Sequence, residues 1–230
     1  AVFHFNLSLM RDPMEQAKKP LRIDIVSDVV CPWCAIGYSQ LAEALKQTNT
    51  PHEIHWHPFE LNPNTPHEGR NYREHIMEKY DTTAEDVKEN RARMTAAGAE
   101  AGFNFQFTDG FHTYNTFNAH QLLHWADQQG RMHDLKQALF VAHFVDNKNV
   151  ADSTVLADVA ANIGLDRFEA LAVIADQRFA NVIREAVQHS KQQGIQSVPS
   201  VIFNGRHLVS GAQGVENYKN ILKQLADMPE

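Results

Sequence analysis

The sequence is poor in cysteine, in cationic residues and in long hydrophobic runs. Its 230 residues include only two cysteines, so a network of structural disulfides is excluded. Acidic residues outnumber Lys and Arg by 28 to 21, and the formal charge of −7 argues against nucleic-acid or anionic-membrane partners. No apolar run approaches the ~18 residues of a membrane-spanning helix. We therefore expect a globular protein that binds neither nucleic acid nor membrane.

The first 14 residues do not match the rest of the chain. A secretory signal needs a basic start, an apolar centre and a small-residue cleavage site, and residues 1–14 have none of these. We interpret them as a remnant of an expression vector, with Met14 as a natural start, although a mature form whose signal was removed would look the same. Both cysteines lie in one motif, which favours a cytoplasmic over a periplasmic location.

That motif is Cys31-Pro32-Trp33-Cys34, between an apolar run at 23–30 and a helical pattern. Unpaired N–H groups at a helix N-terminus favour an anion, so we expect the pKa of the Cys31 thiol to fall below the ~8.5 of free cysteine. Cys34 lies one turn further along, where it can attack a mixed disulfide on Cys31. Pro32 suits the first helical turn, and Trp33 is expected to shape or cover the site.

Two other interpretations of the cysteine pair stay open. The first is that the two cysteines are half of a zinc site, but the sequence contains no second Cys-x-x-Cys. The histidines His52, His55 and His57 cluster, but no carboxylate is clearly placed to complete a site with them. The second is that the cysteines form a structural disulfide, although so short a loop constrains the unfolded chain little. We favour redox chemistry and expect no bound metal.

The chain begins with the pattern of a strand, a helix and a second strand, at 21–28, 32–48 and 52–57. From residue 71 to about 193 we find no convincing strand. Helical patterns recur there over 72–80, 83–101, 115–129, 132–145, 153–163 and a long run from 166.

The last part of the chain returns to strands. Residues 198–203 and 206–211 are separated by Asn204-Gly205, which is a strong hairpin signal, and 215–226 reads as a final helix. A helical block of this length is too long for a loop, so we interpret it as an inserted helical unit.

Aromatic residues gather in a loop of that block, at Phe103, Phe105, Phe107 and Phe111. Buried packing is the ordinary role of such residues. A second hypothesis is that they join Trp33 and Phe59 in an apolar patch for unfolded substrate.

Five segments together resemble the thioredoxin superfamily, its DsbA-like branch, and most narrowly the FrnE-type dithiol-disulfide isomerases. They are 28–37 (Asp-Val-Val-Cys-Pro-Trp-Cys-Ala-Ile-Gly), 59–63, 115–126, 194–203 and 209–213, and the resemblance covers about residues 20–226. It implies an α/β thioredoxin fold with a large all-helical insertion. Residues 15–66 and 190–230 would form the discontinuous thioredoxin-like domain, and 67–189 the helical insertion.

The resemblance implies roles for single residues. Cys31 would attack a disulfide and Cys34 would resolve the product. Pro199 would be a cis-proline facing the disulfide, with Val198 offering backbone groups to an extended substrate. The alternative for Pro199 is a trans proline at the start of an edge strand. DsbA itself carries His where Trp33 stands here, which argues against a strong oxidant.

The implied activity is thiol–disulfide exchange with protein or small-molecule disulfides, without a bound cofactor and with glutathione or another dithiol as redox partner. Asp28 either caps the helix in solvent or relays protons to Cys34. Two alternatives remain: a kappa-type glutathione transferase or isomerase, which typically has serine for the cysteine pair, and a peptide-binding chaperone-like module. We expect a monomer or homodimer.

Overall fold

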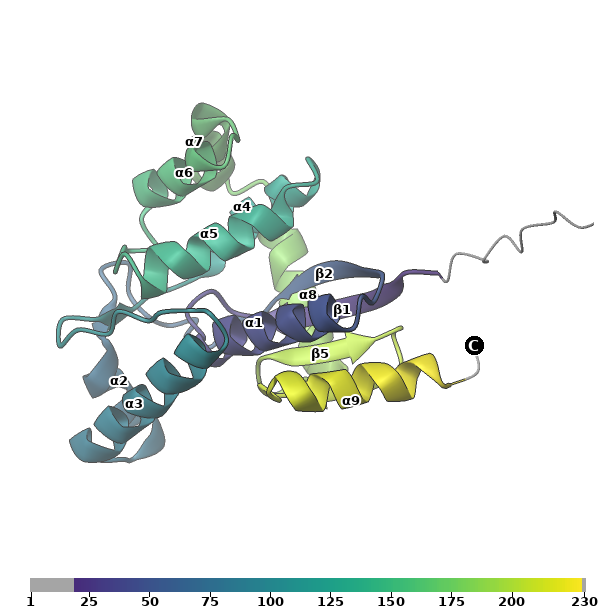
Figure 1. Ribbon diagram of the computed structural model, residues 1–230. Coiled ribbons are helices and arrows are strands. Elements are labelled where there is room, and N and C mark those ends of the chain that lie inside the picture. The colour runs from purple at the N-terminus through teal and green to yellow at the C-terminus, as the bar shows by residue number, and fades with distance from the viewer. Residues whose placement is uncertain (1–18, 229–230) are drawn as a thin grey trace, which may run out of the picture.

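A mixed four-stranded sheet lies at the centre of the computed structural model, which describes residues 19–228 (Figure 1). The strand order is β2-β1-β5-β6, with β1 (Leu21–Ser27), β2 (His52–Pro58), β5 (Ser200–Phe203) and β6 (His207–Ser210). The pair β1–β2 is parallel and the other pairs are antiparallel. Parallel neighbours need a crossover connection, and α1 (Pro32–Gln47) supplies it. Since α1 begins where β1 ends, the cysteine motif lies at one end of the sheet.

Helices cover both faces of this sheet. The helices α1 and α9 (Val215–Ala226) pack against each other on one face, and α9 has the bounds expected from the sequence. On the other face, α8 (Ala180–Gln192) packs on β2. Because β1 is covered on both sides, its last five residues are all buried, including the polar Asp24 and Ser27.

The chain between β2 and β5 is mainly helical, as expected. Besides α8 it contains α2 (Tyr72–Tyr80), α3 (Ala84–Glu100), α4 (Phe117–Asp127), α5 (Met132–Phe144), α6 (Ser153–Asn162) and α7 (Arg167–Asp176). The fold is therefore the expected α/β arrangement with inserted helices. The exact domain division at residue 189 stays a prediction, and α8 runs past it to Gln192.

Two predictions about this segment are wrong. The run from residue 166 is two helices, because Gln177 adopts a left-handed conformation (φ 54°) and its amide bonds to Asn118 and to the Ile174 carbonyl. The segment also contains strand residues, since β4 (His112–Thr113) pairs with β3 (Arg70–Asn71). A two-residue ladder is too short for an alternating pattern, and the break at Gln177 depends on a tertiary contact.

The hairpin prediction is confirmed. Asn204 and Gly205 both have positive φ, 51° and 67°, and with Arg206 they form a three-residue turn that pairs Phe203 with His207. No helix within residues 19–228 is long and apolar enough to cross a membrane. The interpretation of residues 1–14 lies outside the described part of the chain.

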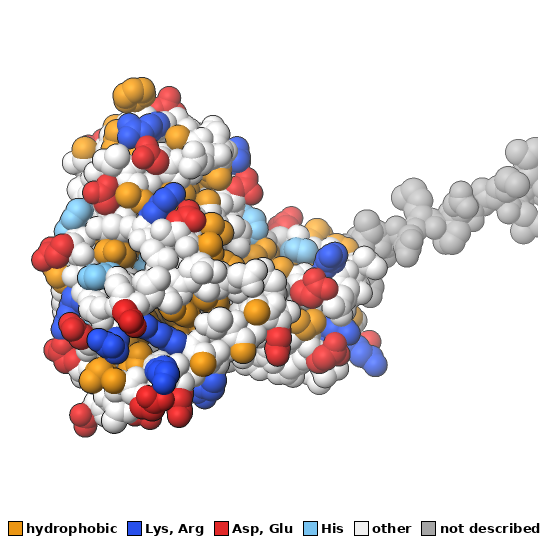
Figure 2. Space-filling model, turned by 60° about the vertical axis from the view of Figure 1, so that its left-hand side comes forward, with side chains coloured by type: hydrophobic (Ala, Val, Ile, Leu, Met, Phe, Trp, Pro, Cys, Tyr) orange, Lys and Arg blue, Asp and Glu red, His pale blue; other side chains and the backbone are white. Residues whose placement is uncertain are grey.

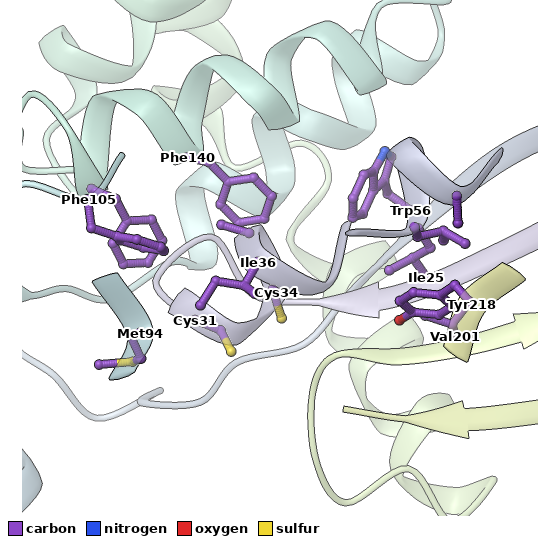
Figure 3. Close-up of a cluster of buried hydrophobic side chains, with 14 of the residues drawn as sticks. Ile25, Cys31, Cys34, Ile36, Trp56, Met94, Phe105, Phe140, Val201 and Tyr218 are labelled. Carbon is purple, nitrogen blue, oxygen red and sulfur yellow. The ribbon is translucent and has the colours of Figure 1, made fainter. Parts of the chain in front are cut away.

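The cysteine motif lies where two hydrophobic clusters meet. Cys31 and Cys34 belong to the cluster that joins the sheet and α1 to Met94 and Phe140 of the inserted helices (Figure 3). Val29 and Val30, just before Cys31, belong to the second cluster, which is formed mainly by α4 to α7. The inserted helices therefore form part of the immediate support of the motif.

Candidate active site

Both cysteines are free thiols at the first turn of α1, and both are buried. Cys31 occupies the N-cap position and Pro32 the first helical position, while the Cys34 N–H donates to the Cys31 carbonyl at 3.0 Å. The Cys31 thiol donates to the Val198 carbonyl at 3.7 Å, a contact across 167 positions of sequence. The fold thus brings the predicted substrate-binding backbone directly to the predicted nucleophile.

The peptide bond between Val198 and Pro199 is cis, as the resemblance implied. The Pro199 carbonyl accepts a hydrogen bond from the Gly211 N–H at 2.8 Å, which ties this turn to the end of β6. Gly37 of α1 allows the close approach, because a Cβ at this position would lie 3.2 Å from Pro199 Cγ. Gly37 belongs to the first matched segment, but no local pattern shows that it faces Pro199.

Cys34 lies behind Cys31 in a more enclosed environment. Its side chain is 1% exposed, and burial raises the pKa of the Cys34 thiol well above its usual value. The neighbouring Cys31 adds to this increase of the pKa, whereas the backbone of Asp28 and the charge of Lys136 oppose it. Cys34 is therefore kept as a thiol in the resting protein.

Asp28 is fully buried, so the interpretation of it as a solvated or capping residue is wrong. One carboxylate oxygen accepts from the Leu61 N–H at 2.7 Å, and the other lies 3.4 Å from His120 Nε2. His120 in turn donates to the Phe59 carbonyl at 2.9 Å. Burial alone would raise the pKa of Asp28, but His120 and the Leu61 N–H together hold it below the usual value.

A cavity of about 710 Å³ opens in front of Cys31. The predicted residues that line it are Cys31, Pro32, Trp33, Phe59 and Val198. Its opposite wall comes from the inserted helices, with Tyr72, His75 and Lys79 of α2 and Met94 of α3. Figure 2 shows a hollow on this side of the molecule with hydrophobic side chains in it and charged groups around it. Sequence patterns did not identify the α2 residues, because only the fold brings them to the motif.

The DSBA-like thioredoxin domain family model matches residues 22–223 of the chain. The protein belongs to this family. The uncharacterized protein YwbO of Bacillus subtilis (strain 168) is 25% identical over 203 residues, which cover 88% of this chain and 96% of that protein.

Solved structures agree with the family. The probable DsbA oxidoreductase SCO1869 from Streptomyces coelicolor superposes with a TM-score of 0.84 at 28% identity, covering 91% of this chain and 92% of that one. A 2-hydroxychromene-2-carboxylate isomerase (TM-score 0.69, 11% identity, 89% and 96% covered) is more distant. The cytosolic disulfide reductase DsbM from Pseudomonas aeruginosa with GSH is also more distant. It superposes with a TM-score of 0.62 at 14% identity, covering 90% of this chain and 100% of that one. Both of these share the fold with this chain.

The phenylalanine loop of this DsbA-like protein is part of the core. Phe105 and Phe111 are 5% and 2% exposed, and Phe105 stacks on Phe107 with ring centres 5.1 Å apart. None of the four loop rings lines the front cavity among the described residues. Buried packing is therefore their role here, and of the expected apolar patch only Trp33 and Phe59 face the cavity.

Proposed function

We propose that this protein is a thiol–disulfide oxidoreductase that acts through a mixed disulfide on Cys31. The observation that carries the proposal is the contact of the Cys31 thiol with the carbonyl of the cis Val198–Pro199 unit, at the wall of the front cavity. A substrate in extended conformation would pair with the backbone at Val198, which brings its sulfur to Cys31. The family and its named oxidoreductase neighbours support the same chemistry.

In the proposed reaction, the Cys31 thiolate attacks one sulfur of a substrate disulfide and releases the other sulfur as a thiolate. The Cys34 thiolate then attacks Cys31 Sγ, so that the Cys31–Cys34 disulfide forms and the substrate leaves as its second thiolate. The substrate gains two electrons and two protons from the dithiol. Running the same steps backwards oxidises a substrate dithiol.

Peptide thiols are the substrate class that the cavity favours. Its volume of about 710 Å³ suits a peptide segment or a tripeptide, and Lys79 and Lys191 provide cations for a carboxylate. Glutathione is therefore the proposed redox partner, as the glutathione-containing structure of DsbM also suggests. We also propose a cytoplasmic location, which the cysteine usage and the cytosolic DsbM support.

The decisive experiment is a redox titration of the Cys31–Cys34 pair in glutathione buffers, read by tryptophan fluorescence with Trp33 as the nearest reporter. We expect one reversible two-electron transition. A potential near the ~−270 mV of thioredoxin would identify a reductant or isomerase, and one near the ~−120 mV of DsbA an oxidant. The variant Trp33→Phe tests whether Trp33 carries the signal. The absence of any two-electron transition would reject the proposal.

A glutathione-linked isomerase or transferase is the second candidate, because a structure of such an isomerase shares the fold. The two free cysteines at the site argue for redox chemistry instead. The variant Cys34→Ser separates the candidates. It should abolish turnover in disulfide exchange, whereas a glutathione transferase activity that survives in it would favour the second candidate.

A further inference from the structure

A buried lysine lies behind the dithiol, and the proposed mechanism does not yet use it. Lys136 of α5 is 1% exposed, although lysine is among the residues least often fully buried. Its Nζ lies 5.3 Å from the centre of the Trp56 ring and 5.2 Å from that of Phe140. Aromatic faces stabilise a cation less than a directly bonded carboxylate does, so this burial has a cost that function would explain.

The surroundings of Lys136 connect it to the cysteines. Phe140, one turn along α5, is in the same cluster as Cys31 and Cys34 and lies above the first turn of α1 (Figure 3). Burial lowers the pKa of Lys136 to about 8, while Cys34, Asp28 and Cys31 act to raise this pKa. The effect is mutual, because the charge of Lys136 acts to lower the pKa of Cys34.

A second cavity, of about 260 Å³, reaches Lys136 and His120. Its wall also includes His55 and His57 of β2, whose side chains are 42% and 40% exposed, so it connects the buried lysine with the surface. Cys31 and Trp33 line the front cavity and not this one. Lys136 therefore has an approach to solvent that a substrate bound in front of Cys31 would not close.

We propose that Lys136 is a positioning residue for the resolving step, in which its positive charge stabilises the Cys34 thiolate. This inference rests on the proposed thiol–disulfide exchange. In that step Cys34 first loses its proton to solvent, and its thiolate then attacks Cys31 Sγ. The bond between Cys31 and the substrate sulfur breaks, and the substrate leaves as a thiolate that takes up a proton. One inserted helix thus supplies the charge for a dithiol on α1.

Other titratable groups face Lys136 from the elements around it. Asp28 comes from the β1–α1 connection, His55 and His57 from β2, and His120, His124 and Asp127 from α4. The helix α6 also packs on α5, but its one acidic residue, Asp158, is exposed and pairs with Arg167. Of the charged groups at this site, Lys136 carries the positive charge that acts to lower the pKa of Cys34.

The test isolates the resolving step in a single turnover. One equivalent of an aromatic disulfide such as Ellman's reagent loads Cys31 and releases a first coloured thiolate. Attack of Cys34 on Cys31 Sγ then releases a second coloured thiolate, and the rate of this second phase is followed against pH. In Lys136→Met we expect the rate at pH 7 to fall about tenfold and the midpoint of the profile to rise by about one pH unit, which corresponds to that tenfold change. Lys136→Arg should restore the charge and most of the rate.

Phe140→Leu is the matched control, because it changes the packing around Lys136 and keeps the charge. It should leave the midpoint of the pH profile unchanged. Lys136→Gln serves as a second neutral variant if Lys136→Met fails to fold, and it should shift the midpoint in the same direction. Equal slowing in the Arg and Met variants, or no change in either neutral variant, would overturn the inference. If the wild-type protein released no second thiolate after Cys31 was loaded, the proposed function itself would be rejected.

Discussion

The two cysteines are one helical turn apart and almost equally hidden, at 4% and 1% exposure, yet their surroundings differ. Cys31 faces the large front cavity and the backbone of Val198. Cys34 faces the rear, where Asp28 and Lys136 influence its pKa. The front offers a cavity and a backbone carbonyl to a substrate, and the rear influences the protonation of Cys34. The same side chain therefore acquires two chemical roles from its neighbours.

Different segments of the chain form the front and the rear of the site. The front combines the motif and the cis-proline turn with α2 and α3. The rear combines the β1–α1 connection with His120 of α4 and Lys136 of α5. Both sides thus depend on the inserted helices, although every cysteine comes from the thioredoxin-like part.

The largest expected effect comes from exchanging the two cysteines for serine one at a time. Cys31→Ser should abolish formation of a mixed disulfide with glutathione, because the front nucleophile is gone. Cys34→Ser should form that mixed disulfide and retain it, because nothing resolves it. Intact-mass measurement after reaction with oxidised glutathione distinguishes the two. A stable glutathione adduct in Cys31→Ser would reverse the assignment of front and rear.

Asp28→Asn tests the charge at the rear. The pKa of Asp28 is below its unfolded value of about 3.9, so its carboxylate stabilises the fold at neutral pH, and this contribution is lost as the pH falls through the folded-state pKa. Replacing the buried charged acceptor of the Leu61 N–H should cost about 2 kcal/mol at pH 7. Urea unfolding should give a difference between wild type and variant that shrinks below about pH 4.

The same experiment has a surface control. Asp176→Asn changes a carboxylate that is paired with Arg178 at the surface, and exposed pairs contribute little. Its unfolding free energy should stay close to that of the wild type at every pH. A loss in Asp28→Asn that is independent of pH would mean that shape rather than charge matters at this position.

The front residues were easier to predict from the sequence than the rear ones. Cys31 and Cys34 form a local motif, and Val198-Pro199 lies in a segment that resembles a known family, so spacing and resemblance identified them. Asp28 lies three residues before the motif, in the first matched segment, but its hydrogen bonds involve Leu61 and His120, and His120 is 92 positions away in the chain. Local patterns describe neighbours along the chain and do not contain such contacts.

The role of Lys136 was also not predicted from the sequence, although its position in a helix offered one signal. Lys136 lies in the helical pattern 132–145 next to Leu135 and four residues before Phe140, so it shares a face with an apolar residue. A lysine on the buried side of a helix is unusual, and that position alone would have marked it for attention. Its proximity to the cysteines, however, follows only from the packing of α5 on β2.

A smaller effect is expected where the front is held together, at Gly37. An added Cβ would lie 3.2 Å from Pro199 Cγ and 3.4 Å from Ala212 Cα. In Gly37→Ala the gain in helix propensity, about 1 kcal/mol, should largely offset this crowding. Gly37→Val lacks that gain and should cost about 1–3 kcal/mol through overpacking. Thermal unfolding and the KM for glutathione disulfide should change together in Gly37→Val, because the shift reaches Pro199.

The smallest expected effect is electrostatic and lies at the rim of the front cavity. Lys191 is exposed, with its Nζ 5.9 Å from the centre of the Phe59 ring, and it lines the cavity. An exposed charge contributes about 0.5–1 kcal/mol, so Lys191→Met should raise the KM for glutathione disulfide roughly two- to fivefold. Lys46→Met, in the last turn of α1 and away from the cavity lining, is the matched control.

A neutral disulfide such as 2-hydroxyethyl disulfide completes this test. Its KM should be unchanged in Lys191→Met, since it carries no carboxylate for the cation to bind. The effect on glutathione disulfide should also weaken at high salt, because exposed charges are screened. The contribution of Lys136 to the resolving step should persist at the same salt concentration, since buried charges are screened much less. Equal sensitivity of both lysines to salt would contradict the distinction between an open front and an enclosed rear.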